Sequence, residues 1–255
     1  MSAGSSEGFV NSTAPYPLFR VARMSLIPLL IASLMILLPG VSGHSLAQTT
    51  ISSRVKDSTQ VLDEIMSAPQ TRIPPSLLQT SHAIAVIPNV FKIGFILGGR
   101  TGRGILIVKD EQRNWAGPVF VTLRGTSIGI QSGVMLSDVV LIFKRSASLE
   151  ALSSQSLIFG ADASIMAGPL SFQVDEMTDP LLPSEIYSYS RGLGLFVGVS
   201  LQGASLELDL RRTAAFYGID DLSLSDVLSG RITELPPEAQ GFLHTLAEHS
   251  KPRTR

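Results

Sequence analysis

The chain has 255 residues, a formal net charge of −1 and 44% hydrophobic residues. Cysteine is absent, which excludes disulfides, thiolate metal sites and cysteine nucleophiles. The near-neutral charge predicts no nucleic-acid partner, and the length is sufficient for one large domain with a substantial core.

The first 47 residues have the pattern of a signal peptide. Arg20 and Arg23 precede an apolar run, residues 25–38, that is shorter than the roughly 20 residues of a transmembrane helix. Ser45-Leu46-Ala47 then places small residues where a signal peptidase reads, which predicts cleavage before Gln48. We expect an exported chain, periplasmic or secreted and peripheral to a membrane, with an uncleaved N-terminal anchor as the alternative.

Helices are expected near both ends of the mature chain. Apolar residues recur at helical spacing over residues 51–66, which indicates an amphipathic helix, and Pro74-Pro75 opens a short second helix. Later helices are expected over residues 148–154, 211–217, 223–228 and 236–248. The predicted organisation is a single domain over residues 48–250, with a helical lead-in (51–80), a β-rich core (82–210), a helical end (211–249) and a tail (251–255).

β-branched and apolar runs between these helices predict strands. Pro88-Asn89 is expected to stop the first strand, residues 110–114 to form a turn, and Ser137-Asp138 to divide a later strand. The remaining long loop is expected over residues 175–184. The predicted strand regions are residues 83–87, 90–97, 104–108, 119–123, 126–143, 157–174 and 187–210.

Glycine recurs at about every fourth residue in three of these apolar runs. The positions are Gly94, Gly98 and Gly102; Gly125, Gly129 and Gly133; and Gly194, Gly198 and Gly203. On a strand this spacing leaves one face bare, and we expect that face to pack against a neighbouring element. Interspersed charges such as Lys92 and Arg191 exclude packed membrane helices. The predicted fold is α+β: a strongly bent, mostly antiparallel glycine-rich β-sheet or partial barrel with flanking N- and C-terminal helices.

Matches to catalytic or metal-binding patterns are weak. Residues 98–104 resemble a phosphate-binding loop, but they lead into a strand, so a hairpin turn is predicted. Ser127 lies in a Gly-Thr-Ser-Ile-Gly pattern, although the strand-like residues after it make a serine hydrolase a remote alternative. His82, His244 and His249 are interpreted as solvated. We therefore expect no enzyme activity, cofactor or metal.

Charge is distributed unevenly along the mature chain. Residues 92–145 contain eight basic and three acidic residues, whereas residues 146–250 contain four basic and fourteen acidic residues. Such asymmetry can orient a protein on an anionic surface, although solvated faces can also differ by chance.

Several sequence blocks together resemble the SYLF domain over about residues 60–245. They are Ala83-Ile-Ala-Val-Ile-Pro88, Phe91-Lys-Ile-Gly-Phe-Ile-Leu-Gly-Gly99, Trp115 with Gly117-Pro118, Gly125-Thr-Ser-Ile-Gly-Ile-Gln131, Phe159-Gly-Ala-Asp162, Ala167-Gly-Pro169, Tyr187-Ser-Tyr-Ser-Arg-Gly192 and Gly198-Val-Ser-Leu-Gln-Gly203. The resemblance implies a lipid-binding module with phosphoinositide binding and, in yeast endocytic members, actin binding. Exported bacterial members exist, and this chain resembles them. His82-Ala83 departs from the Lys-Gly that the family usually has.

The resemblance and the charge map together predict a site. The leading hypothesis is a non-enzymatic module that docks on anionic phospholipid or phosphoinositide-type headgroups through the helix at residues 51–66 and a set of basic residues. This predicted basic set is Lys92, Arg100, Arg103, Lys109, Lys144 and Arg145. The alternative is a structural or protein-interaction module, which includes actin-type binding.

Overall fold

The computed structural model describes residues 43–68, 72–94, 97–128, 133–154, 156–168, 184–192, 195–196, 201–229, 232 and 234–251. Residues 1–42 of the predicted leader and residues 175–183 of the predicted long loop lie outside this part. Residues 43–47 form the first turn of a helix that continues into the predicted mature chain.

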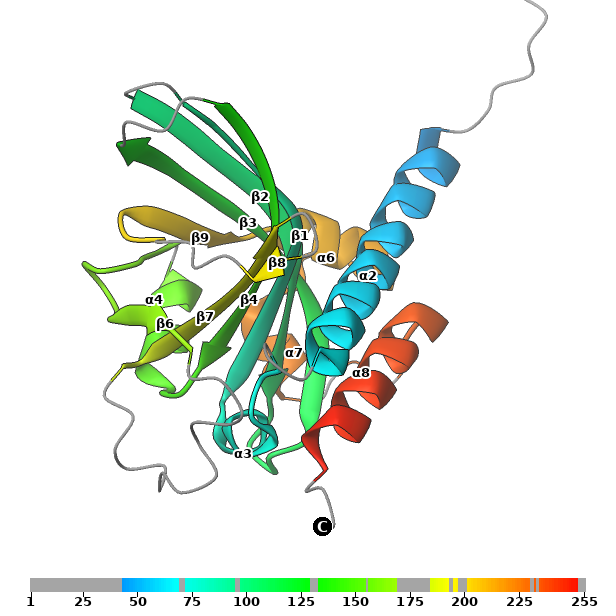
Figure 1. Ribbon diagram of the computed structural model, residues 1–255. Coiled ribbons are helices and arrows are strands. Elements are labelled where there is room, and N and C mark those ends of the chain that lie inside the picture. Colours follow the sequence, from blue (N-terminus) through cyan, green and yellow to red (C-terminus); the bar gives the residue numbers. More distant parts are fainter. Residues whose placement is uncertain are drawn as a thin grey trace, which may run out of the picture. The chain divides into compact units, whose positions relative to one another are not determined.

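The described strands form one nine-stranded sheet that curls strongly (Figure 1). Its order is β5-β9-β3-β2-β1-β4-β7-β6, with β8 paired to β7, and only the β6–β7 pair is parallel. The strands are β1 (Ala83–Gly94), β2 (Leu97–Lys109), β3 (Trp115–Ile128), β4 (Gly133–Phe143), β5 (Ser156–Ile158), β6 (Ile165–Ala167), β7 (Ile186–Gly192), β8 (Leu195–Phe196) and β9 (Ala204–Leu208).

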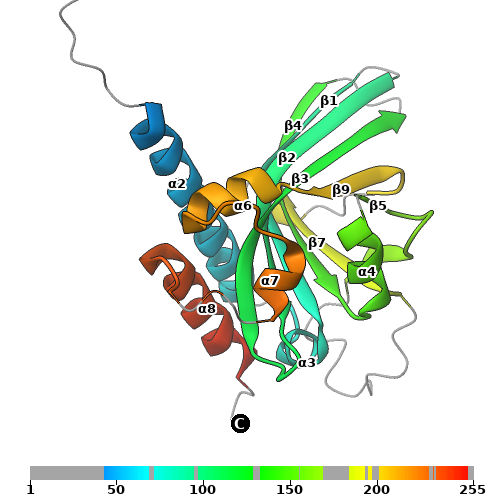
Figure 2. The same ribbon diagram turned by 180° about the vertical axis from the view of Figure 1, so that it is seen from behind.

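Helices cover both faces of the sheet, which confirms the predicted α+β fold. The helices are α2 (Gly43–Ser67), α3 (Pro75–Thr80), α4 (Ala147–Ser154), α6 (Leu210–Tyr217), α7 (Leu224–Leu228) and α8 (Pro237–Ser250). Helices α2, α3 and α8 pack on the outer face, while α4 and α7 fill the inside of the curl (Figures 1 and 2). In the described part of the chain, no helix has the length and apolarity to cross a membrane.

The amphipathic helix is present, and its apolar face is already used. Val55 and Leu62 of α2 are fully buried against the outer face of the sheet, together with Phe242 and Leu246 of α8. Burial of such side chains contributes about 1.5–3 kcal/mol each. From Ile51 onward, the apolar face of α2 is therefore part of the core.

Charged side chains connect α2 to the outer face of the sheet. The Arg191 guanidinium on β7 donates to Glu64 of α2 and, at 3.0 Å, to Asp138 of the neighbouring strand β4. A hydrogen bond from Gln60 and the contact with Arg191 lower the pKa of Glu64, and the two carboxylates raise the pKa of Arg191 despite its partial burial. The helix, β4 and β7 are thus connected through one guanidinium.

Strand β1 has a one-residue bulge at the position where the sequence predicts the end of the first strand. Val86 pairs with Ile105 and Phe91 with Thr101, so five steps along β1 match four steps along β2. Asn89 absorbs the extra residue at a left-handed φ of 52°. The prediction that Pro88-Asn89 stops the strand is therefore wrong, because a bulge lets the ladder resume beyond it.

Gly94, Gly98, Gly102, Gly125 and Gly133 lie within strands, and the close packing expected of the bare face is confirmed at Gly102 and Gly125. Gly203 instead lies in a turn at a φ of 75°, and Gly129, Gly194 and Gly198 lie outside the described residues. A Cβ on Gly104 would lie 2.1 Å from the Val86 carbonyl oxygen, and one on Gly102 would lie 2.8 Å from the side chains of Ile87 and Val90. At Gly125 a Cβ would lie 2.8 Å from Ala204. The absence of side chains therefore lets adjacent strands and their side chains approach closely where the sheet bends.

Two further predictions are corrected. Residues 98–104 are not a hairpin turn but part of β2, which pairs with β3 from Leu97 to Lys109 and with β1 from Gly98 onward. Strand β4 is also continuous through Ser137-Asp138, where Asp138 accepts a hydrogen bond from the bulged Asn89 N–H at 3.0 Å.

Candidate interaction surfaces

The end of the sheet beyond the helices carries exposed apolar side chains. Phe91 and Ile93 on β1 are 37% and 52% exposed, and Val134 and Leu136 on β4 are 63% and 49% exposed. Phe91 lies opposite Leu136, and Ile93 lies opposite Val134. These four residues, which we call the sheet-end surface, form two adjacent cross-strand pairs on one face.

The bulge in β1 decides which face these residues occupy. Before it, Ile84 and Val86 face the helical layer, and after it the odd-numbered residues Phe91 and Ile93 take that face. A one-residue shift reverses every side chain that follows on a strand. In both views the free ends of β1 to β4 point away from α2 (Figures 1 and 2), so among the described elements no helix covers this part of the outer face.

The predicted basic set is divided among different parts of the fold. Lys92 and Arg100 are cross-strand neighbours on the opposite, inner face of the projecting strands. Lys92 is half-buried and Arg100 is only 8% exposed, and burial lowers the pKa of Arg100. Arg103 is exposed on the outer face, and Arg145 lies 4.0 Å from Glu185 at the other end of the sheet. The structure does not gather these residues into one patch.

Lys109 and Lys144 have a structural role below helix α3. The Lys109 ammonium donates to the carbonyl oxygens of Leu78 and Gln79 and lies 4.5 Å from the centre of the Trp115 ring. Lys144 donates to Thr80 Oγ1 at 3.1 Å. Burial, with a smaller contribution from the charge of Arg113, lowers the pKa of Lys109 to about 8. These two cations donate hydrogen bonds to acceptor oxygens at the C-terminal end of α3, where helix carbonyl groups lack partners within the helix.

Two of the three histidines that were interpreted as solvated are only partly exposed and also contact protein groups. His82 is half-buried with Nδ1 at 2.9 Å from the Lys144 carbonyl oxygen, and burial lowers its pKa. His249 Nε2 lies 2.9 Å from Asp63 Oδ1 and links α8 to α2. His244 alone of the three is exposed as predicted.

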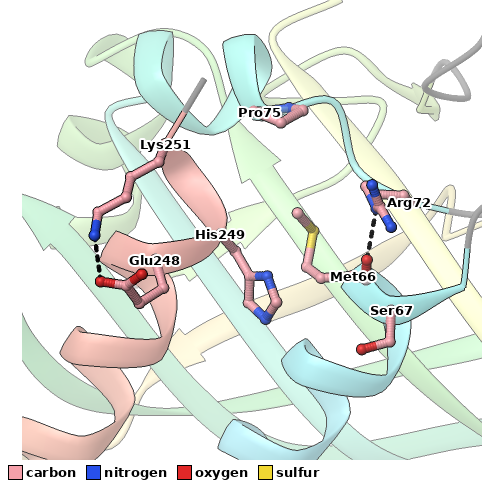
Figure 3. A pocket seen from close by; sticks show the side chains of 7 residues that line it. All are labelled: Met66, Ser67, Arg72, Pro75, Glu248, His249 and Lys251. Carbon is pink, nitrogen blue, oxygen red and sulfur yellow. Dashed lines mark hydrogen bonds and ion pairs between the residues drawn. The ribbon is translucent and has the colours of Figure 1, made fainter. Parts of the chain in front are cut away.

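A cavity of about 330 Å³ lies where α2 and α8 end (Figure 3). Arg72 points into it and donates from Nε to the Met66 carbonyl oxygen at 2.6 Å, which closes the end of α2. Lys251 pairs with Glu248 at 2.5 Å and lowers the pKa of that carboxyl group. The charged groups drawn here serve the two helix ends, so this cavity is a weaker candidate for a ligand site.

The described residues provide no catalytic constellation. Ser127 lies inside β3 opposite Gly98, so the strand–turn–helix that a nucleophile elbow needs does not occur at this serine. No group of three or more metal-ligating side chains occurs among the described residues. Together, the fold and the sheet-end surface define an α+β domain whose exposed features are suited to binding.

Comparison with known proteins agrees with the sequence resemblance. The family model Ysc84, described as "Las17-binding protein actin regulator", matches residues 124–249. Protein YSC84 of Saccharomyces cerevisiae is 29% identical over 215 residues, covering 81% of this chain and 45% of the relative. LAS seventeen-binding protein 3 of the same yeast is 28% identical over 208 residues, covering 78% and 44%. SH3 domain-containing YSC84-like protein 1 of Xenopus laevis is 29% identical over 199 residues, covering 78% and 55%.

The chain carries a domain of the Ysc84 (SYLF) family. It spans about half the length of the curated relatives that it matches. The family model is described in terms of Las17 binding and actin regulation.

Proposed function

We propose that this chain is a protein-interaction module and that the sheet-end surface is its contact. The observation that carries the proposal is the exposure of four large apolar side chains in two adjacent cross-strand pairs, beyond the helices that cover the rest of that face. Contiguous exposed apolar residues of this kind mark interaction sites.

The names of the relatives suggest the type of partner. One is described as binding Las17, and the family model is described as an actin regulator. Las17 and actin filaments are therefore the first partners to test. Export of the mature chain is a separate proposal, and binding assays with purified proteins test the surface independently of where the chain is located.

The test is a pelleting assay with actin filaments and a pull-down with Las17. The variant Ile93→Thr/Val134→Thr replaces two exposed apolar side chains with residues that keep the β-branched shape suited to strands. We expect it to weaken binding by about tenfold, because truncation of a central interface residue costs about 1–2 kcal/mol or more.

Ile158→Thr on β5 is the matched control. Ile158 is also a strand residue, is 40% exposed, and lies outside the sheet-end surface. Its binding should equal that of the unchanged chain. Equal binding by the double variant and the control would reject the surface, and binding to neither Las17 nor actin would reject these partners.

Docking on an anionic phospholipid surface is the second candidate. The observation that favours it is an exposed cation close to the sheet-end surface. The side chain of Arg124 on β3 is 63% exposed. Thr101 on β2 pairs with Arg124 on one side and with Phe91 on the other, so one strand separates the cation from the sheet-end surface. Each such cation contributes about 1 kcal/mol near an anionic membrane.

Co-sedimentation with vesicles separates the two candidates. Membrane docking predicts binding that rises with anionic lipid and falls with salt, and it predicts loss in the Arg103→Gln/Arg124→Gln variant. Arg100 is left unchanged in this variant because it is buried. Equal binding to neutral vesicles would reject the electrostatic component.

A further inference from the structure

Three arginines from three separate elements line one small cavity on the outer face. Arg54 comes from α2, Arg103 from β2 and Arg212 from α6, and the cavity volume is about 60 Å³. Figure 2 shows α6 lying beside α2 over this face of the sheet. We call this cavity the arginine pocket; the sequence separates its cations by as much as 158 positions (from residue 54 to residue 212).

The arginine pocket has an excess of positive charge. Asp209 is the one carboxylate among its lining residues, so three guanidinium groups and one carboxylate leave a formal charge of +2. Asp209 is engaged by its own helix, because it accepts from the Arg212 backbone N–H at 3.1 Å and from the Arg212 side chain. Among the described residues, Arg54 pairs loosely with Asp57, at 4.0 Å, and Asp57 lies outside the lining.

Arg103 is the cation most available to a ligand. Among the described residues it forms no ion pair with a carboxylate, whereas Arg124, on the adjacent strand β3, lies 3.6 Å from Glu207. Ile51 and Phe120, which are nearly buried, form the apolar lining of the pocket. An apolar lining lowers the local dielectric and strengthens charge-assisted hydrogen bonds.

The size and the donors of the pocket suit one small oxyanion. A water molecule needs about 10–15 Å³ by this type of measure, so the cavity accommodates about four to six atoms of that size. A phosphate group is of this size, and its tetrahedral oxygens can accept from several planar guanidinium groups at once. A carboxylate would use fewer of the donors and would neutralise only half of the excess charge.

We propose that the arginine pocket binds a phosphomonoester-type dianion, supplied either as free phosphate or as the headgroup of a lipid. Arg103 provides the principal contact, Arg54 and Arg212 add charge from the two helices, and Asp209 limits the affinity. This site is separate from the sheet-end surface, so it stands or falls independently of the proposed protein interaction.

The direct test is calorimetric titration of the chain with inorganic phosphate at constant ionic strength. Arg103→Gln should weaken phosphate binding by about tenfold or more, because a hydrogen bond to a charged group is lost. Asp209→Asn should tighten it, since the variant removes the lining carboxylate and asparagine is an equally good helix N-cap. Arg124→Gln is the matched control on the same face and should leave phosphate binding unchanged.

A second measurement distinguishes the sources of the phosphate group. Phosphatidylcholine vesicles containing phosphatidic acid are compared with vesicles containing phosphatidylserine at equal surface charge. Preference for phosphatidic acid that is lost in Arg103→Gln assigns the site to a lipid headgroup, whereas phosphate binding without that preference assigns it to a free ligand.

The proposal is overturned if the unchanged chain does not bind inorganic phosphate, or if Arg103→Gln and Arg124→Gln weaken binding equally. Circular dichroism and the thermal midpoint of each variant check that the fold is retained. Phosphate binding should also be unchanged in Ile93→Thr/Val134→Thr, which separates a failure of this site from a failure of the sheet-end surface.

Discussion

The close strand packing at Gly104 makes a sharp prediction about stability. A Cβ at this position would lie 2.1 Å from the Val86 carbonyl oxygen and 2.7 Å from the Ile87 Cα. Both neighbours are backbone atoms of a paired strand, so no side-chain rotation relieves the overlap. Gly104→Ala should therefore exceed the usual cost of overpacking and destabilise the chain by about 3 kcal/mol or more.

Gly241 offers the same substitution in the opposite situation. It lies within α8, and nothing is within 4 Å of an added Cβ. Alanine is the better helix former, so Gly241→Ala should stabilise the chain by about 1 kcal/mol. For a domain of this size, each kcal/mol shifts the thermal midpoint by about 2–4 °C.

Thermal unfolding followed by circular dichroism measures both variants. We expect the midpoint to fall by about 6–12 °C in Gly104→Ala and to rise by about 2–4 °C in Gly241→Ala. A Gly104→Ala midpoint within about 2 °C of the unchanged chain would refute close backbone packing at the bend.

Three further predictions concern charge, pH and processing. Arg191→Gln should lower the free energy of unfolding, measured by urea denaturation, by about 1–2 kcal/mol after allowance for solvent screening. The control Arg124→Gln should lower it by less than about 0.5 kcal/mol. Equal losses would contradict the role of Arg191 in fixing α2. Burial lowers the pKa of His82 below its usual 6.5, so the unfolded chain binds the proton more readily than the folded chain. The free energy of unfolding should therefore fall as pH decreases through about 6.5, and His82→Gln should flatten that decrease. An unchanged pH profile in the variant would contradict this role of His82. Secretory expression should yield a soluble chain whose intact mass corresponds to residues 48–255, and a membrane-bound chain that retains its N-terminus would instead support an anchor.

Local patterns predicted the helices well because each has a clear start, end or apolar period. Residues 211–217 were predicted as a helix that the structure places at Leu210–Tyr217, where Asp209 caps its start and Gly218 ends it at a left-handed φ of 67°. Pro236 and Pro237 similarly mark the start of α8. These signals lie within a few residues of the element that they define.

The candidate surfaces depend on contacts that the sequence does not display. Phe91, Ile93, Val134 and Leu136 have the composition of buried strand residues, and only the extension of the sheet beyond its helices leaves them exposed. The predicted basic set was selected by proximity in sequence, but Lys109 is used to hold α3 and Arg100 is buried. The one member in the arginine pocket, Arg103, meets Arg54 and Arg212 only through tertiary packing.

The sequence by itself determined the α+β class, the glycine-rich bent sheet, the flanking helices and the resemblance to the SYLF family, because periodicity, glycine spacing and ordered motifs are local properties. The tertiary structure decided which face each residue occupies beyond the bulge at Asn89, and which cations meet. The physical reason is the two-residue period of a strand: one additional residue in β1 reverses the direction of every later side chain, and only pairing with β2 and β4 fixes where that residue is inserted.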